Sequence, residues 1–285
     1  STGGTLTLNS LTTITGSTTT PIKTEFSGNL SGSFGLTKNG IDTLILSGDD
    51  STVATTPLVI NPYTGNIALT NGVLKVSHLR ALGTMAGTTT ISSTGTLLID
   101  SNNYTITEPF TIGGDGVATT QGAIRNLGKI TTLAGNITLG ASARITSAGY
   151  NTTAPSDSLI ITGNINTVNA AYVLTTDVQE GMRIAGIISG AGGLTKVGTD
   201  SLIISGANSY SGATIVSAGL VQIQNQDAFG STNPGPSSTS ASTTSIAGGA
   251  ELKIIGDNFI IPETLTLEGN GVNNVGVVYN PSGKN

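Results

Sequence analysis

Two stretches that lie far apart in the chain have nearly the same sequence. "LSGSFGLTKNGIDTLILSG" occupies residues 30–48, and "ISGAGGLTKVGTDSLIISG" occupies residues 188–206. Such self-similarity is typical of folds in which one supersecondary unit is copied and stacked. The residues that match at a constant offset of 158 are Ser31, Gly32, Gly35, Leu36, Thr37, Lys38, Gly40, Asp42, Leu44, Ile45, Ser47 and Gly48.

The repeat extends well beyond these stretches, with one insertion. After Gly48 the offset falls to 147, so that Asn61, Tyr63, Gly65 and Gly72 match Asn208, Tyr210, Gly212 and Gly219. About eleven residues, roughly 50–60, are therefore inserted in the first copy. Further on, "EPFTIGGDGV" (108–117) matches "ETLTLEGNGV" (263–272). We predict two long repeats, 1–156 and an incomplete 157–285, in one continuous solenoid.

Within each repeat, apolar residues alternate with polar ones in short segments. Examples are "GTLTLNS", "DTLILSG", "GNITLGA", "SLIISGA" and "AELKIIG", which are bounded by Gly, Asn, Ser and Asp. A period of two between such boundaries indicates β-strands. Only "VLKVSHLRAL" (73–82) and "TTDVQEGM" (175–182) approach the periodicity of a helix. The sequence therefore predicts an all-β chain.

Many similar short strands, each with one apolar face, can share a core by coiling and stacking. Connections between parallel strands are strongly right-handed, and turn residues are available for the corners. These features predict a right-handed parallel β-helix, with twelve to fourteen turns of about 20–25 residues and a length of about 60 Å. A two-sheet sandwich is the alternative, but it leaves the long repeat unexplained.

The composition suits a thin, regular core and excludes several partners. The chain has 40 Gly, no Cys, no Trp and 4% aromatic residues, and it has a formal net charge of −5. Without a basic stripe, we expect no binding to nucleic acid. We also expect no direct membrane insertion, because no run of eighteen apolar residues occurs. The start "STGGTLTLNS" has no signal-peptide pattern, so we expect any such peptide to have been removed.

The segment "GAGGLTKVGTDSLIISGANSYSGATIVSAGLVQIQNQDAFGS" resembles the passenger-associated transport repeat of bacterial autotransporter passengers. The second copy (about 188–231) fits this pattern closely, whereas the first (about 30–84) has Phe34 in place of a glycine and carries the insertion. The resemblance implies a secreted or cell-surface rod that is exported by a C-terminal β-barrel. We expect that translocator to lie outside these 285 residues.

No motif in the chain makes a convincing catalytic, cofactor or metal site. "GAGGLTKVG" (190–198) lacks the end of a phosphate loop, and "GGDGVAT" (113–119) is a single copy of a motif that binds calcium only when repeated. His78, the one histidine, is interpreted as a residue of a solvent-facing corner. We therefore predict no catalytic residue, no cofactor-binding residue and no metal ligand.

Some charged residues remain candidates, because β-helical enzymes cleave polysaccharides with clustered carboxylates. The duplicated ones are interpreted as structural, with the Asp and Lys residues capping or bridging corners, and the unduplicated ones as freer to act. The duplicated residues are Lys38, Asp42, Glu108, Lys196, Asp200 and Glu263. The unduplicated ones are Asp49, Asp50, Asp157, Asp177 and Glu180.

Two segments are candidate loops. The insertion "DDSTVATTPLVINP" (49–62) is either a binding loop or a passive one, and the Ser/Thr-rich segment 230–245 is interpreted as a flexible loop that could be glycosylated. Our first hypothesis is a structural or adhesive surface protein, not an enzyme, whose partners are a host or cell-surface protein or glycan. The alternatives are a subunit that stacks on copies of itself into filaments, and a polysaccharide-cleaving β-helix.

Overall fold

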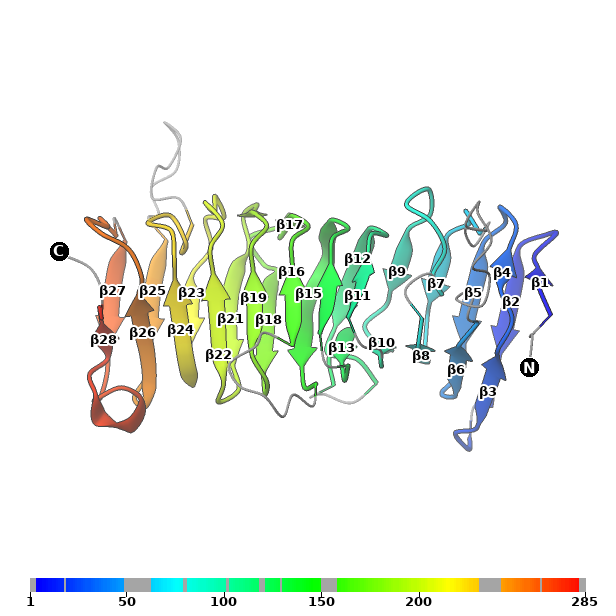
Figure 1. The fold of residues 1–285 in the computed structure, drawn as a ribbon, viewed down its shortest axis with the longest axis horizontal. Coiled ribbons are helices and arrows are strands. Elements are labelled where there is room, and N and C mark those ends of the chain that lie inside the picture. The colour runs from blue at the N-terminus through cyan, green and yellow to red at the C-terminus, as the bar shows by residue number, and fades with distance from the viewer. Residues whose placement is uncertain are drawn as a thin grey trace.

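The computed structural model describes residues 4–17, 19–48, 63–78, 81–100, 103–117, 121–128, 130–149, 158–230, 242–261 and 263–281. These residues form an elongated stack of short strands that runs from one terminus to the other (Figure 1). The sole helical element among them is a 3-10 turn, η1 (Val272–Asn274). The described parts of the two helix-like segments contribute strands instead.

Strands of successive turns pair in parallel and form three ladders, so that a full turn contributes up to three strands. The first ladder contains β2 (Thr12–Thr15), β5 (Leu36–Asn39), β7 (Ile67–Leu69), β9 (Thr89–Ile91), β12 (Phe110–Gly114), the start of β15 (Ile137–Ser147), β17 (Ile165–Asn166) and β20 (Ile188–Ser189).

The second ladder lies on the next face and continues to the last turns. It contains β3 (Lys23–Phe26), β6 (Thr43–Leu46), β8 (Gly72–Val76), β10 (Gly95–Ile99), β13 (Ile124–Asn126), the end of β15, β18 (Val173–Val178), β21 (Gly193–Val197), β23 (Thr214–Val216), β25 (Thr243–Ile246) and β27 (Thr264–Leu267). Because β15 bends around the corner, it pairs in both ladders.

The third ladder forms a separate sheet. It contains β11 (Tyr104–Ile106), β14 (Thr131–Leu133), β16 (Leu159–Ile161), β19 (Met182–Ile184), β22 (Ser201–Ile204), β24 (Gly219–Ile223), β26 (Ala250–Ile254) and β28 (Val278–Tyr279). A short pair, β1 (Leu6–Thr7) with β4 (Leu30–Ser31), lies at the N-terminal end. The predicted all-β parallel β-helix is thus confirmed.

The number of turns predicted from the sequence is too high. The helix has about ten turns, not twelve to fourteen. The number of residues in one turn varies, as the register partners show: the turn from Leu202 to Val221 is short, and the turn from Leu36 to Ile67 is much longer. Segments between strands lengthen many turns beyond the predicted length, because they add chain without adding a strand. At a strand spacing of about 4.8 Å, ten turns give a rod of roughly 50 Å rather than about 60 Å.

The core consists of columns in which like side chains stack from turn to turn. In the third ladder, Leu133, Ile161 and Ile184 are consecutive register partners and are fully buried. Burying each such side chain contributes roughly 1.5–3 kcal/mol of stabilisation relative to its exposure to water. The column continues to the C-terminal end through Ile204, Ile223 and Ile254.

One corner of the helix is built from stacked glycines that precede the first-ladder strands. A Cβ atom at Gly163 would lie 2.0 Å from the carbonyl oxygen of Gly135, and one at Gly186 would lie 2.1 Å from that of Gly163. Gly206 makes the same approach to Gly186, at 2.4 Å. The turns can therefore close to strand spacing at this corner only without side chains, which explains why glycine recurs at these boundaries in the sequence.

The two copies of the repeat occupy different faces of the rod. In the first copy, "GLTK" forms β5 of the first ladder, whereas the matching segment of the second copy forms β21 of the second ladder. The strands that follow, β6 and β22, differ in the same way. The offset between the copies is therefore not a whole number of turns, and the second copy begins one face further around the helix.

The glycine corner gives a test of the close stacking. We expect Gly163→Ala to lower the melting temperature markedly, because its Cβ atom would collide with backbone that cannot move independently. Gly248 has no heavy atom within 4 Å of its Cβ position, so Gly248→Ala is the control and should change little. Thermal unfolding followed by circular dichroism compares the two, and equal effects would contradict the stacking.

Candidate functional site

Five of the six duplicated charged residues are buried inside the rod, and the sixth, Asp200, is partly exposed. Lys38 and Lys196 have 1% of their surface exposed, and Asp42, Glu108 and Glu263 are also buried. Each lies within a strand or at the corner next to one. They are the most unusual chemical groups of the core, because charged residues are seldom fully buried.

Both lysines use their ammonium group to bind three backbone carbonyl oxygens at a corner. Lys38 Nζ donates to the carbonyls of Asn39, Gly40 and Asn71 at 3.1, 2.7 and 3.1 Å. Lys196 Nζ donates to the corresponding oxygens at 3.3, 2.9 and 2.9 Å, those of Val197, Gly198 and Ala218. One oxygen in each set belongs to the next turn, so we call each arrangement a lysine clamp.

Burial lowers the pKa of both clamp lysines. The pKa of Lys196 falls to about 8 because burial disfavours the ammonium, which Asp200 and Asp177 partly offset. Burial also lowers the pKa of Lys38, and Asp42 opposes this effect. The predicted role of the duplicated Lys and Asp at the corners fits this arrangement. Asp42 Oδ2 accepts a hydrogen bond from the Ser17 amide at 2.7 Å, and Asp200 accepts one from the Ser201 amide at 2.6 Å.

Each lysine clamp is followed, over the next three turns, by a buried Tyr, a buried Thr and a buried Glu. In the second copy, the hydroxyl groups of Tyr210 and Thr214 lie 2.6 Å apart. Glu263 accepts hydrogen bonds from Thr244 Oγ1 at 2.6 Å and from Ser242 Oγ at 2.9 Å. Both carboxylate oxygens of Glu263 therefore have a partner.

The first copy has the same buried Tyr, Thr and Glu, but these residues have fewer polar partners. Ile67 takes the place of Thr214, and Gly87 takes the place of Ser242. Glu108 keeps its hydrogen bond from Thr89 Oγ1, at 2.7 Å, but its Oε2 atom is buried without a hydrogen-bond partner. Burial raises the pKa of Glu108 to about 8, an effect that the Thr89 hydrogen bond opposes. The protonated, neutral acid is therefore the main form at neutral pH.

Several other charged groups form ion pairs across turns. Arg144 bridges Asp115 at 3.3 Å and Asp177 at 3.2 Å, and Lys75 pairs with Asp100 at 2.6 Å. The pairs that involve Asp100 and Asp115 are partly exposed and contribute little to stability individually, whereas Asp177 is buried. Asp177, which the sequence left as a free candidate, is thus a partner of Arg144.

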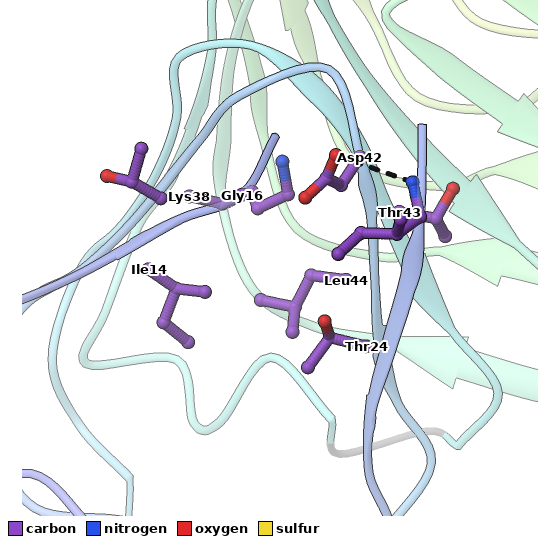
Figure 2. A pocket seen from close by; sticks show the side chains of 9 residues that line it. Ile14, Gly16, Thr24, Lys38, Asp42, Thr43 and Leu44 are labelled. Carbon is purple, nitrogen blue, oxygen red and sulfur yellow. Dashed lines mark hydrogen bonds between the residues drawn. The ribbon is translucent and has the colours of Figure 1, made fainter. Parts of the chain in front are cut away.

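A small pocket lies near the N-terminal end of the rod, between β2, β3, β5 and β6. Ile14 and Leu44 face each other across it, with Asp42 and Lys38 along its edge (Figure 2). Both charged groups already bind backbone atoms. The pocket therefore offers a ligand mainly aliphatic surface.

The other residues considered in the sequence do not meet in one place. His78 packs against Tyr104, with ring centroids 5.7 Å apart, and Glu180 is partly buried at a corner. Asp157, the whole insertion (49–62) with Asp49 and Asp50, and most of segment 230–245 lie outside the described residues. Among the described residues, no group of three or more His, Asp or Glu could hold a metal ion. No helix in the same part of the chain is long and apolar enough to cross a membrane.

Sequence reasoning identified the clamp residues but missed the hydroxyl partners of the acids. Ser242 and Thr244 lie at the end of a Ser/Thr-rich run that resembles a plain loop. A signal was nevertheless present, since the separation between Thr89 and Glu108 equals that between Thr244 and Glu263. A short turn of this helix has that length, so matching the two spacings would have paired the side chains.

Glu108 predicts a specific dependence of stability on pH. Its pKa is raised in the folded chain, so its favourable contribution is complete below the unfolded value of 4.5 and is lost as pH rises towards about 8. We expect Glu108→Gln to stabilise the chain by roughly 3 kcal/mol more at pH 7 than at pH 4.5. Urea unfolding at both pH values measures this, with the exposed Glu268→Gln as control. An equal effect at both pH values would contradict a neutral Glu108.

Comparison with known proteins agrees with this geometry. The family model of the passenger-associated-transport-repeat matches residues 36–76 and 194–223, which contain the two lysine clamps. The chain is 30% identical, over 160 residues and 55% of its length, to the adhesin BmaC autotransporter of Brucella suis. It spans only 4% of the length of that relative. No solved structure matches it. The chain is therefore a parallel β-helix in which two segments match the passenger-associated-transport-repeat.

Proposed function

We propose that the chain is a segment of an autotransporter passenger that is secreted or displayed on a bacterial surface, where it acts as a rigid adhesive rod. The observation that carries this proposal is the placement of the duplicated chemistry. The polar groups that recur in both copies are buried and bind backbone or one another. They serve the construction of a rod, which leaves its outer faces and loops to contact a partner.

The proposal also has support from the relative, which is named an adhesin. A host or cell-surface protein or a glycan is the partner class that fits an adhesive rod. Adhesion needs no catalytic group, and we propose that the segment is not an enzyme. An enzyme of the polysaccharide-cleaving type would require carboxylates that converge on one groove. Asp100 is instead paired with Lys75, and Asp115 and Asp177 share Arg144 as their ion-pair partner.

Stacked turns also suit export of an unfolded chain. Each folded turn presents a complete strand edge on which the next turn can pair, so that folding can proceed stepwise. The clamps join consecutive turns through Lys38 and Lys196. Progressive folding outside the cell would then hinder backward sliding of the chain.

A display experiment tests the proposal. The chain is fused to the translocator of an autotransporter and produced in a Gram-negative bacterium that does not adhere. We expect antibody labelling of intact cells, and adherence to cultured epithelial cells several-fold above that of bacteria displaying the translocator alone. A variant with Lys38→Met and Lys196→Met should reach the surface in smaller amounts, because two turns lose their clamps.

A different experimental result would contradict each part of the proposal. A chain that stays inside the cell, although it folds when purified, would contradict a role as a passenger. Display on the surface without adherence would contradict the adhesive role and would indicate that the segment acts only as a spacer. Fibres of variable length in electron micrographs of the purified chain would favour end-to-end assembly instead.

A further inference from the structure

The first lysine clamp differs from the second in the residues whose carbonyl groups it holds. In the first clamp these include Asn39 and Asn71, and each is followed by a glycine. In the second clamp Val197 and Ala218 stand at the same places, also followed by glycine. Asn–Gly is the dipeptide that most readily cyclises to a succinimide, because glycine has no side chain to hinder ring closure.

We propose that the first clamp is a site of spontaneous modification, at which Lys38 promotes succinimide formation and deamidation of Asn71 and Asn39. The reaction begins when a base removes the proton of the Gly72 amide. The nitrogen then attacks Cγ of Asn71 and expels ammonia, which closes the ring. Water opens the ring to aspartate or isoaspartate, so that one water is consumed and one ammonia is released. Asn39 reacts in the same way through the Gly40 amide.

The ammonium group of Lys38 is placed where the reaction develops negative charge. Deprotonation of the Gly72 amide puts charge on its own peptide carbonyl, which is the oxygen of Asn71. Lys38 Nζ lies 3.1 Å from that oxygen and 3.1 Å from the oxygen of Asn39, which belongs to the other Asn–Gly peptide bond. A buried cation stabilises such charge more strongly than one in water.

The side-chain amides are also held near their nucleophiles. The Gly72 amide donates to Asn71 Oδ1 at 2.8 Å, which keeps the attacking nitrogen beside the amide carbon of Asn71. Thr70 Oγ1 donates to the Lys38 carbonyl oxygen at 2.9 Å and also lies 3.3 Å from Asn39 Oδ1, which helps to hold the side-chain amide of Asn39 in place. Gly40 and Gly72 have φ angles of 87° and 78°, a backbone conformation that favours glycine. The Gly72 amide is shared between Asn71 Oδ1 and the Thr94 carbonyl oxygen, which lies 3.2 Å away.

The chain contains its own reference for an Asn–Gly pair without a clamp. Asn270 precedes Gly271, whose φ angle of 77° is almost that of Gly72. The carbonyl of Asn270 accepts from the Gly276 amide at 2.9 Å rather than from a lysine. Asn270 is exposed and Asn71 only partly so, and exposure alone would therefore make Asn270 the faster site.

Peptide mapping by mass spectrometry tests the proposal on the folded chain. The chain is incubated at neutral pH and 37 °C, and replacement of the side-chain NH2 by OH is followed at the three asparagines. We expect product at Asn71 and Asn39 to form several-fold faster than at Asn270. Lys38→Met should slow both clamp sites, leave Asn270 unchanged, and be rescued in part by Lys38→Arg. Faster reaction at Asn270, or clamp sites unaffected by Lys38→Met, would overturn the proposal.

A second variant tests the proposal without removing a clamp. Ala218→Asn places an Asn–Gly pair on the carbonyl that Lys196 holds at 2.9 Å. We expect deamidation at this new site at a rate above that of Asn270. A rate at or below that of Asn270, in a chain with an unchanged circular dichroism spectrum, would show that a clamp does not promote the reaction.

Discussion

Parallel hydrogen bonding between the backbones of successive turns is the constraint on which the rest of the structure depends. It holds consecutive turns at the spacing of paired strands. A side chain of one turn therefore lies directly above its register partner in the preceding turn. Apolar partners such as Ile161 and Ile184 then form dry columns. The same spacing excludes any side chain at the corner of Gly163. Charged groups lie inside where they bind the backbone, as Lys38 and Lys196 do.

The two copies of the repeat share the same order of buried polar residues, but they do not share the same faces of the rod. The clamp lysine, Tyr63 or Tyr210, and Glu108 or Glu263 follow one another in the same order in both copies, although the second copy is one face further around. A ligand that contacts one face would therefore meet different parts of the two copies. We infer that the duplicated residues stabilise the rod. A partner would then be recognised by residues that are not repeated from turn to turn.

Much of the fold could be predicted from the sequence, because alternation and repeat spacing are local signals. The parallel ladders follow from them, as does the interpretation of Lys38 as a structural residue at a corner. The number of turns could not be derived, since segments of variable length lie between strands, as between β15 and β16. Two further features could not be predicted: the shift of the second copy by one face, and the Glu108 Oε2 atom that lacks a hydrogen-bond partner. Both depend on which turn stacks on which. The repeat alignment alone does not contain that register.

Disulfide trapping of register partners tests this stacking most directly, in a chain that has no cysteine of its own. Thr175 and Thr195 are partners on the outer side of β18 and β21, at a spacing that a disulfide bond can span. With Thr175→Cys and Thr195→Cys, the account predicts rapid intramolecular cross-linking under mild oxidation. Thr175→Cys with Ile203→Cys joins different faces and should remain reduced. Cross-linking of the second pair in preference to the first would contradict the stacked β-helix.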